Sequence, residues 1–384
     1  MRVRIGPRLL PIALAGSVVV AQVGTAAGQS RTLATNDRLV LGSAADLTAS
    51  VVFADVDGDG DLDILYANGR HWPQANEVYL NNGAGRFTVG LPLGSELATS
   101  YGVPAGDLDG DGDADVVVAN DMAENWMYRN DGTGRFTLAW AVGPEIEPTR
   151  SAQLHDLDGD GDLDVLVTNR GVANGFYLND GTGRFGAKRV FGDSAGSTIA
   201  VAVGDLDEDG DPDLVLANRD GQPNQVLIND GALGFDRART FGTGRDETRS
   251  VALADLDADG HLDIVAGNIG EPNAVYLGRG DGSFGPGIPF GADDPTYAVA
   301  AADIDGDGDL DVVVANAGTG NAVYLNDGRG SGWAEMRLGD DADATYGLAV
   351  GDLDGDGYPE VAFANSGSPN RIYANVPSRP GGNP

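Results

Sequence analysis

Seven short acidic segments have the residue types and spacing of a cation-binding loop. Each follows the pattern Asp-x-Asp-x-Asp-Gly-x-x-Asp, and the first, DVDGDGDLD, begins at Asp55. Carboxylates at positions 1, 3, 5 and 9, with the backbone carbonyl of position 7, can surround one cation, and Gly at position 6 permits the sharp turn. Hard oxygen ligands on a flexible loop favour Ca²⁺ over Mg²⁺, zinc or copper. The pattern therefore predicts up to seven bound calcium ions.

The predicted ligands occupy equivalent positions in these segments, which we call loops 1 to 7 in chain order. They are Asp55, Asp57, Asp59, Asp61 and Asp63; Asp107, Asp109, Asp111, Asp113 and Asp115; Asp156, Asp158, Asp160, Asp162 and Asp164; Asp205, Asp207, Asp209, Asp211 and Asp213; Asp255, Asp257, Asp259, His261 and Asp263; Asp303, Asp305, Asp307, Asp309 and Asp311; and Asp352, Asp354, Asp356, Tyr358 and Glu360.

A few loop positions depart from the pattern. His261 and Tyr358 stand at position 7, where only the carbonyl is needed, so we expect both to be tolerated. The longer Glu360 replaces aspartate at position 9, which predicts weaker binding in loop 7. Glu208 and Ala258 replace glycine at position 4, which affects the backbone and not the ligand set.

The loops recur at steps of 48 to 52 residues, so each belongs to a repeat. One apolar run ends at the loop, as at 201–204, and a β-branched run such as 116–119 follows it. A third run, as at 323–325, leads through an Asn-Asp-Gly turn to a fourth. Four short antiparallel strands per period predict an all-β fold, a seven-bladed β-propeller with four strands per blade.

The strand before each loop alternates small and larger residues. In the fifth repeat Ser250, Ala252 and Ala254 alternate with Val251 and Leu253. Because side chains of a strand point alternately to opposite faces, we expect the small set to face the propeller axis. The larger set would then pack between neighbouring sheets.

The two ends of the chain predict how the ring closes. The seventh repeat ends near 372–375 without a fourth strand, whereas 39–42 matches the end of a fourth strand in the other copies. We therefore expect the N-terminal strand to complete the last blade, which removes an open sheet edge. The predicted propeller spans 28–376, and the Pro/Gly-rich residues 377–384 are expected to be a disordered tail.

Residues 1–27 have the features of a signal peptide. Arg2, Arg4 and Arg8 precede an apolar stretch at 9–21, which is too short to span a membrane, and small residues follow at 24–27. No later segment reaches membrane-spanning length. The sequence thus predicts a secreted, extracellular or periplasmic protein. It has no cysteine, which excludes disulfides and thiolate ligands.

The formal net charge is −35, and 34 of the 59 acidic residues lie in the seven loops. The acidity is therefore mostly loop chemistry, and it argues against nucleic acid as a partner because two polyanions repel each other. We expect a monomer whose partner is an unidentified protein or carbohydrate.

The loops resemble those of the FG-GAP/VCBS-type repeat family, which is related to the propeller of integrin α subunits. The resemblance covers nearly all of 38–376 and includes a recurrent Gly-Arg-Phe. It implies a seven-bladed propeller that holds calcium between the first and second strands of each blade, and by itself it implies no enzymatic activity.

We expect a calcium-binding module of adhesion type that binds protein or glycan. Two alternatives remain, a calcium-dependent enzyme acting on polysaccharide and a structural protein of the cell envelope. Three histidines, no cysteine and no nucleophile–base pattern give little support for catalysis, so no catalytic residue is predicted.

The end of the propeller opposite the loops is a second candidate surface. Trp72, beside Arg70 and His71, either stacks on a sugar or protein or covers the end of the core, and the second interpretation is favoured. Five residues at the starts of inner strands either ring the mouth of the axial channel or pack between blade ends. They are Tyr101, Arg150, Arg249, Tyr297 and Tyr346.

Overall fold

The computed structural model describes residues 31–339 and 342–378. The segment predicted as a signal peptide lies outside this part of the chain, as does 379–384 of the predicted tail. Strands dominate the fold, together with one short 3-10 helix, η1 (Asp37–Leu39). In the described residues, no helix has the length and apolar character needed to cross a membrane.

Four antiparallel sheets contain four consecutive strands each. They are β3 (Ser50–Ala54), β4 (Asp63–Ala67), β5 (Gln74–Leu80) and β6 (Val89–Ala98); β16 (Thr198–Gly204), β17 (Asp213–Asn218), β18 (Asn224–Ile228) and β19 (Arg237–Phe241); β20 (Thr248–Ala254), β21 (Asp263–Asn268), β22 (Asn273–Tyr276) and β23 (Ile288–Phe290); and β24 (Thr296–Ala302), β25 (Asp311–Asn316), β26 (Asn321–Asn326) and β27 (Trp333–Leu338).

The other strands form a nine-stranded and a five-stranded sheet. The larger contains β7 (Ser100–Gly102), β8 (Ala105–Gly106), β9 (Asp115–Ala123), β10 (Trp126–Asn130), β11 (Phe136–Ala141), β12 (Glu147–His155), β13 (Asp164–Asn169), β14 (Asn174–Tyr177) and β15 (Arg189–Phe191). The smaller contains β1 (Arg31–Ala34), β2 (Val40–Leu41), β28 (Thr345–Gly351), β29 (Glu360–Asn365) and β30 (Asn370–Pro377).

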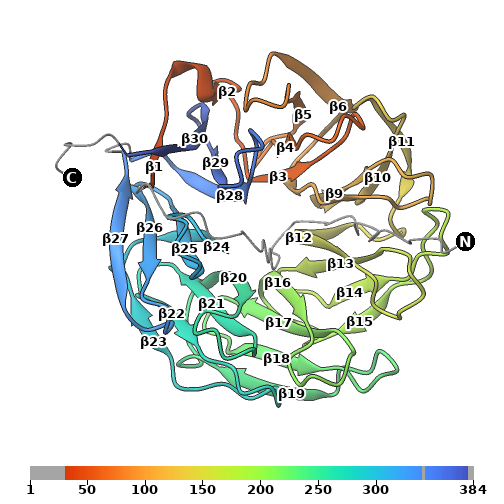
Figure 1. The fold of residues 1–384 in the computed structure, drawn as a ribbon. Coiled ribbons are helices and arrows are strands. Elements are labelled where there is room, and N and C mark those ends of the chain that lie inside the picture. The colour runs from red at the N-terminus through yellow and green to blue at the C-terminus, as the bar shows by residue number, and fades with distance from the viewer. Residues whose placement is uncertain (1–30, 340–341, 379–384) are drawn as a thin grey trace, which may run out of the picture.

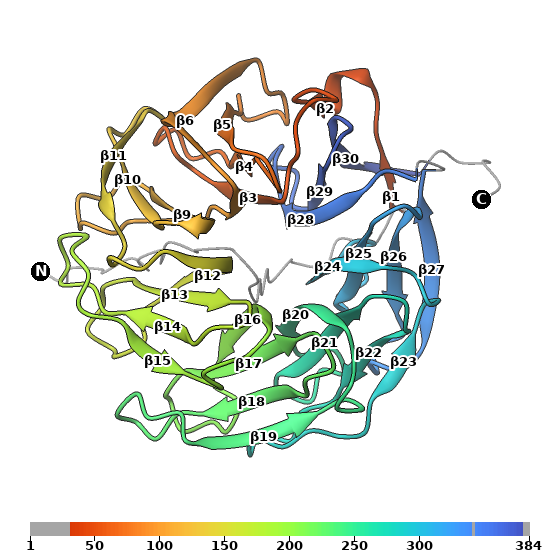
Figure 2. The same ribbon diagram turned by 180° about the vertical axis from the view of Figure 1, so that it is seen from behind.

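The sheets stand around a common axis as in a β-propeller (Figure 1; Figure 2 shows the other side). The inner strands β3, β7, β12, β16, β20, β24 and β28 each contact the next, and β28 contacts β3. Each sheet thus turns an edge strand, not a face, toward the axis. Both faces of a sheet are therefore available to pack against its neighbours.

This orientation corrects the prediction for the inner strand. Val251 and Leu253 of β20 pack on the preceding sheet, whereas Ala252 and Ala254 pack on the following one, and all four are 2% exposed. Ser250 lines the cavity on the axis as expected, but Ala252 and Ala254 do not face the axis. They are small because neighbouring sheets approach most closely near the axis, where a larger side chain would not fit between them.

A chain of buried hydroxyl and amide groups links consecutive repeats. In one step the Thr248 hydroxyl donates to Asn268 Oδ1 (2.8 Å), and Asn273 Nδ2 of the same repeat donates to the Thr296 hydroxyl of the next (3.0 Å). The pattern returns to its start, because Asn370 Nδ2 donates to Thr48 Oγ1 across 322 residues (3.2 Å). The regularly spaced asparagines therefore hold neighbouring repeats together.

The N-terminal segment pairs with the last strand, as the sequence predicted. β1 lies antiparallel to β30, with Arg31 opposite Pro377, and β2 also pairs with β30, with Val40 opposite Arg371. Pro377 is thus the last residue of a strand, although the tail was expected to begin there. A proline is tolerated at this point because it ends the strand.

Candidate metal centres

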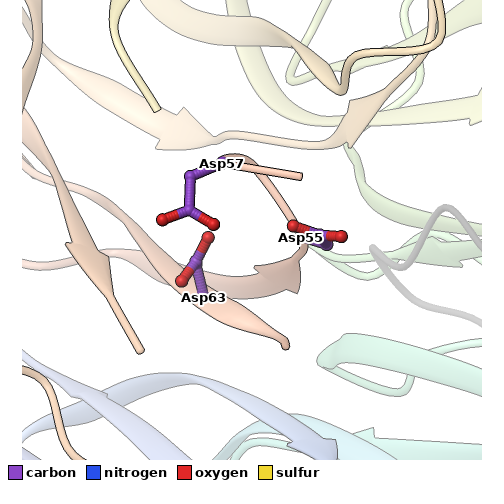
Figure 3. A group of neighbouring side chains, drawn as sticks. All are labelled: Asp55, Asp57 and Asp63. Carbon is purple, nitrogen blue, oxygen red and sulfur yellow. The ribbon is translucent and has the colours of Figure 1, made fainter. Parts of the chain in front are cut away.

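Each acidic loop joins an inner strand to the second strand of its sheet, as loop 1 joins β3 to β4. Oxygen atoms from positions 1, 3 and 9 lie within 4.8 Å of one another in loops 1 to 4, and those from positions 1, 3 and 5 do so in loop 5. Figure 3 shows loop 1, in which the carboxylates of Asp57 and Asp63 face each other with Asp55 beside them. In each of these five loops, three of the predicted side-chain ligands are therefore neighbours in space.

Position 1 shapes the loop as well as offering a ligand. In loop 1 the two carboxylate oxygens of Asp55 accept hydrogen bonds from the N–H groups of Gly58 (2.8 Å) and Gly60 (3.0 Å). Gly60 has a φ of 93°, a conformation that glycine adopts without a steric penalty. Asp59 at position 5 accepts from the N–H of Asp61 (3.0 Å) and lies at the surface.

Position 9 has a structural role that the loop pattern does not reveal. Asp63 is fully buried, and its oxygens accept hydrogen bonds from the N–H groups of Val56 (3.0 Å) and Asn81 (2.7 Å). Glu360 does the same in loop 7, with Leu353 (2.8 Å) and Asn375 (3.1 Å). The longer side chain is therefore accommodated. An asparagine 15 to 18 residues after position 9 in six of the seven repeats was the available signal.

Position 3 carries the observation that best fits a cation. The Oδ1 atoms of Asp57, Asp207 and Asp257 are buried and have no hydrogen-bond partner in the described part of the chain. Burying a carboxylate oxygen without a partner costs free energy unless a cation or a hydrogen-bond donor satisfies it. A cation held between positions 1, 3 and 9 would do so, and the all-oxygen ligand set matches the preference of Ca²⁺.

Burial and crowding of like charges raise the pKa of the position 9 carboxyls. Desolvation is the largest cause in every loop, and the neighbouring aspartates add to it. The pKa rises to about 6 for Asp63, Asp164, Asp213 and Asp263. It rises to about 7 for Asp115, Asp311 and Glu360. These loops thus concentrate negative charge that is unfavourable without a counter-ion.

We predict that the calcium-free protein becomes less stable as pH rises from 5 to 8. The folded pKa values lie above the unfolded ones, so the folded state binds more protons in this window and loses stability as they dissociate. A fall in melting temperature of several degrees, roughly 5 °C, is expected. The melting temperature is measured in metal-stripped buffer. About 0.5 M NaCl is added to screen the long-range repulsion between surface charges.

Calcium should reverse this pH trend, because bound carboxylates are ionised and protons compete with the metal. In calcium-containing buffer the melting temperature is expected to fall as pH drops from 8 to 5. The same pH slope with and without calcium would contradict the prediction.

Three loops differ from the others in their side-chain contacts. In loop 5 the His261 ring contacts Glu208 of loop 4, so only its carbonyl is left for a cation. Arg129 forms an ion pair with Asp109 in loop 2. In loop 7, Arg31 pairs with Asp356 (2.6 Å) and lies over the ring of Tyr358. These arginines supply part of the counter-charge in loops 2 and 7.

The substitutions at position 4 affect the backbone, as expected. Glu208 and Ala258 have φ values of 59° and 55°, which glycine adopts more easily than other residues. Their N–H groups do not cap position 1, and the N–H of position 5 does so instead. Both loops nevertheless keep their acidic groups together.

The fold and these loops define a repeat β-propeller with an acidic loop in each repeat. A model of the FG-GAP-like repeat matches residues 55–118, 107–167, 156–216, 205–266, 255–314 and 303–363, and the chain belongs to this family. The resemblance inferred from the loops is thereby confirmed. Among curated proteins, no sequence relative is found.

Solved structures with a similar fold include two crystal structures of BBS1N in complex with ARL6DN. The mercury-soaked form has a TM-score of 0.63 and 14% identity, covering 91% of this chain and 98% of that one. The lead-soaked form has a TM-score of 0.60 and 13% identity, and the match covers 90% of this chain and 95% of that one. An Agrocybe aegerita lectin that recognises non-reducing terminal N-acetylglucosamine is also similar. Its TM-score is 0.57 and its identity 22%, and the match covers 86% of this chain and 87% of that one. At these identities the similarity concerns the fold alone.

Proposed function

We propose that this protein is an exported, calcium-binding propeller of seven blades that serves as a binding module for protein or glycan. The single observation that carries the calcium assignment is the set of buried, unpartnered position 3 oxygens beside positions 1 and 9. The residues that would hold Ca²⁺ are those of positions 1, 3, 5 and 9, with the carbonyl of position 7. The ion would supply positive charge that fixes each loop.

We infer seven blades by dividing the nine-stranded sheet into two. The two halves of this sheet are connected only where β9 pairs with β12, through Ala123 with Glu147 and Asp121 with Pro148. Division at this point leaves one blade of β7 to β11 and one of β12 to β15. With the four regular sheets and the sheet of β28 to β30 plus the N-terminal strands, the total is seven. The N-terminal strands then complete the last blade, and within the described residues the propeller extends from Arg31 to Pro377.

Binding is favoured over catalysis as the function. One structural neighbour forms a complex with a partner protein, and another recognises a sugar, so the fold accommodates both kinds of ligand. A calcium-dependent polysaccharide-acting enzyme and a structural envelope protein are the alternatives. Export rests on the predicted signal peptide at 1–27.

Calcium counting and ligand screening test this function together. Native mass spectrometry of the protein lacking 1–27 is expected to show up to seven Ca²⁺ ions, with loops 2 and 7 filling last because Arg129 and Arg31 oppose the ion. A glycan array is expected to show saturable binding, and a parallel assay of sugar release to show no product. Released sugar would support the enzyme instead, and absence of any ligand would support the structural alternative.

A further inference from the structure

A cavity lies on the propeller axis at the end opposite the acidic loops. Each inner strand runs from this end toward its loop, and the cavity is lined by the first residues of these strands, including Tyr101, Arg150, Arg249, Tyr297 and Tyr346. Its volume is about 130 Å³. Of the two interpretations weighed from the sequence, the structure supports a ring at the mouth of the channel.

Tyrosines and arginines form a connected cluster around this cavity. The guanidinium of Arg70 lies 3.5 Å from the ring centroid of Tyr346, which meets Tyr297 edge to face at 4.5 Å. The guanidinium of Arg249 lies 5.7 Å from the ring centroid of Tyr297. The aromatic rings hold both guanidinium groups by cation–π contacts, which leave the N–H donors free for other partners.

Arg70 and Arg249 have no carboxylate partner within ion-pair distance in the part of the chain that the structure describes. Two other arginines, Arg70 and Arg219, act electrostatically on Arg249, and both carry the same positive charge. Burial, followed by the charge of Arg70, lowers the pKa of Arg249 to about 10. Two cations without a carboxylate partner therefore lie at this cavity. Arg249 lines it, and Arg70 lies over the ring of Tyr346, which lines it.

Three other arginines at this end are paired with carboxylates. Arg170 binds Asp220 (2.7 Å), and Arg219 binds Glu247 (3.0 Å). Arg150 binds Asp121 (2.8 Å) and also lies over the Tyr101 ring, 4.7 Å from its centroid. The net charge of the chain is −35, so a local positive centre would focus an anion at this one point.

We propose that this axial cavity binds the carboxylate of an acidic sugar, with Arg249 and Arg70 as its anion-binding groups. The cavity has the volume of about four liquid waters, which admits a carboxylate and one edge of a sugar ring. Planar guanidinium groups bind carboxylates through paired N–H donors. This inference rests on the proposed binding function and specifies its ligand class.

Aromatic groups at the mouth favour a sugar over an acidic peptide. Trp72 follows Arg70 in the same loop and is 71% exposed, so it does not cover the core as the favoured interpretation held. An exposed indole offers a flat apolar face on which a pyranose ring can stack. Two residues from Arg70 in the chain, it adds an exposed aromatic face to the tyrosines that line the cavity.

The test is isothermal titration of the calcium-loaded protein with D-glucuronate and D-galacturonate. We expect one of these two uronates to bind at a single site, and we expect no binding of the neutral sugars glucose and galactose. Arg249→Gln and Arg70→Gln should each weaken binding about tenfold or more, since a charge-assisted hydrogen bond is lost. Arg245→Gln is the matched control, because Arg245 is exposed in the loop before β20, and it should bind as the parent does.

Several outcomes would overturn the inference. They are no binding of either uronate, equal binding of acetate, preferential binding of an aspartate-rich peptide, and unchanged affinity in both cavity variants. Native mass spectrometry of the same samples counts calcium, and the glycan array reports binding elsewhere on the propeller. If the protein binds calcium and a ligand on the array but does not bind uronates, this site is refuted and the proposed function is not.

Discussion

Removal of calcium is expected to lower the melting temperature of this protein by roughly 10–20 °C. An ion that binds only the folded state stabilises it by mass action, and each site held at ten times its dissociation constant contributes about 1.4 kcal/mol. Seven such sites add up to about 10 kcal/mol. In their absence, the buried position 3 oxygens of Asp57, Asp207 and Asp257 lack a partner, and repulsion between the acidic groups is uncompensated.

Differential scanning calorimetry with and without EGTA measures this effect. EGTA already saturated with calcium is the control for the chelator itself, and excess calcium should restore the original transition. Magnesium is expected to restore less, because it demands a tighter octahedral geometry. An identical melting temperature in EGTA would eliminate the calcium sites as a source of stability.

The second large effect is expected from Asp164→Ala at position 9 of loop 3. Asp164 is 1% exposed and accepts hydrogen bonds from the N–H groups of Leu157 (2.9 Å) and Asn179 (2.8 Å). The substitution leaves both buried donors unsatisfied, which should cost about 3–5 kcal/mol of unfolding free energy even without calcium. Urea denaturation in EGTA measures this loss apart from any loss of metal.

Asp162→Ala in the same loop is the matched control. Asp162 occupies position 7, where a cation would need only the backbone carbonyl, and its side chain accepts none of the hydrogen bonds seen in this loop. Its replacement is expected to change stability by about 0.5 kcal/mol or less. Equal losses for the two variants in EGTA would show that position 9 has no special structural role.

The acidic loops show how far local sequence patterns reach. The spacing of their aspartates predicted that acidic groups gather in each loop, because the nonapeptide folds on itself through bonds such as that from Gly60 N–H to Asp55. It did not predict that position 9 binds backbone groups outside the loop. The Asn81 N–H that Asp63 accepts is 18 residues away, on another segment of the sheet.

The inner strand shows the opposite case. Its alternation of small and larger residues was visible in the sequence, but the assignment of Ala252 and Ala254 to the axis was wrong. Period-two alternation identifies two faces of a strand without saying what each face meets. The answer depends on how the whole sheet is oriented, since each sheet turns its edge toward the axis.

The sequence by itself determined the repeat, its strands, the acidic loops and the pairing of the N-terminal segment with the last repeat. Each of these is encoded by local spacing or by the count of strands per period. Only the tertiary structure decided which side chains meet across repeats. Arg70 and Arg249 are 179 residues apart in the chain. They lie beside Tyr346 and Tyr297 because the ring brings the loop between β4 and β5 close to the starts of other inner strands.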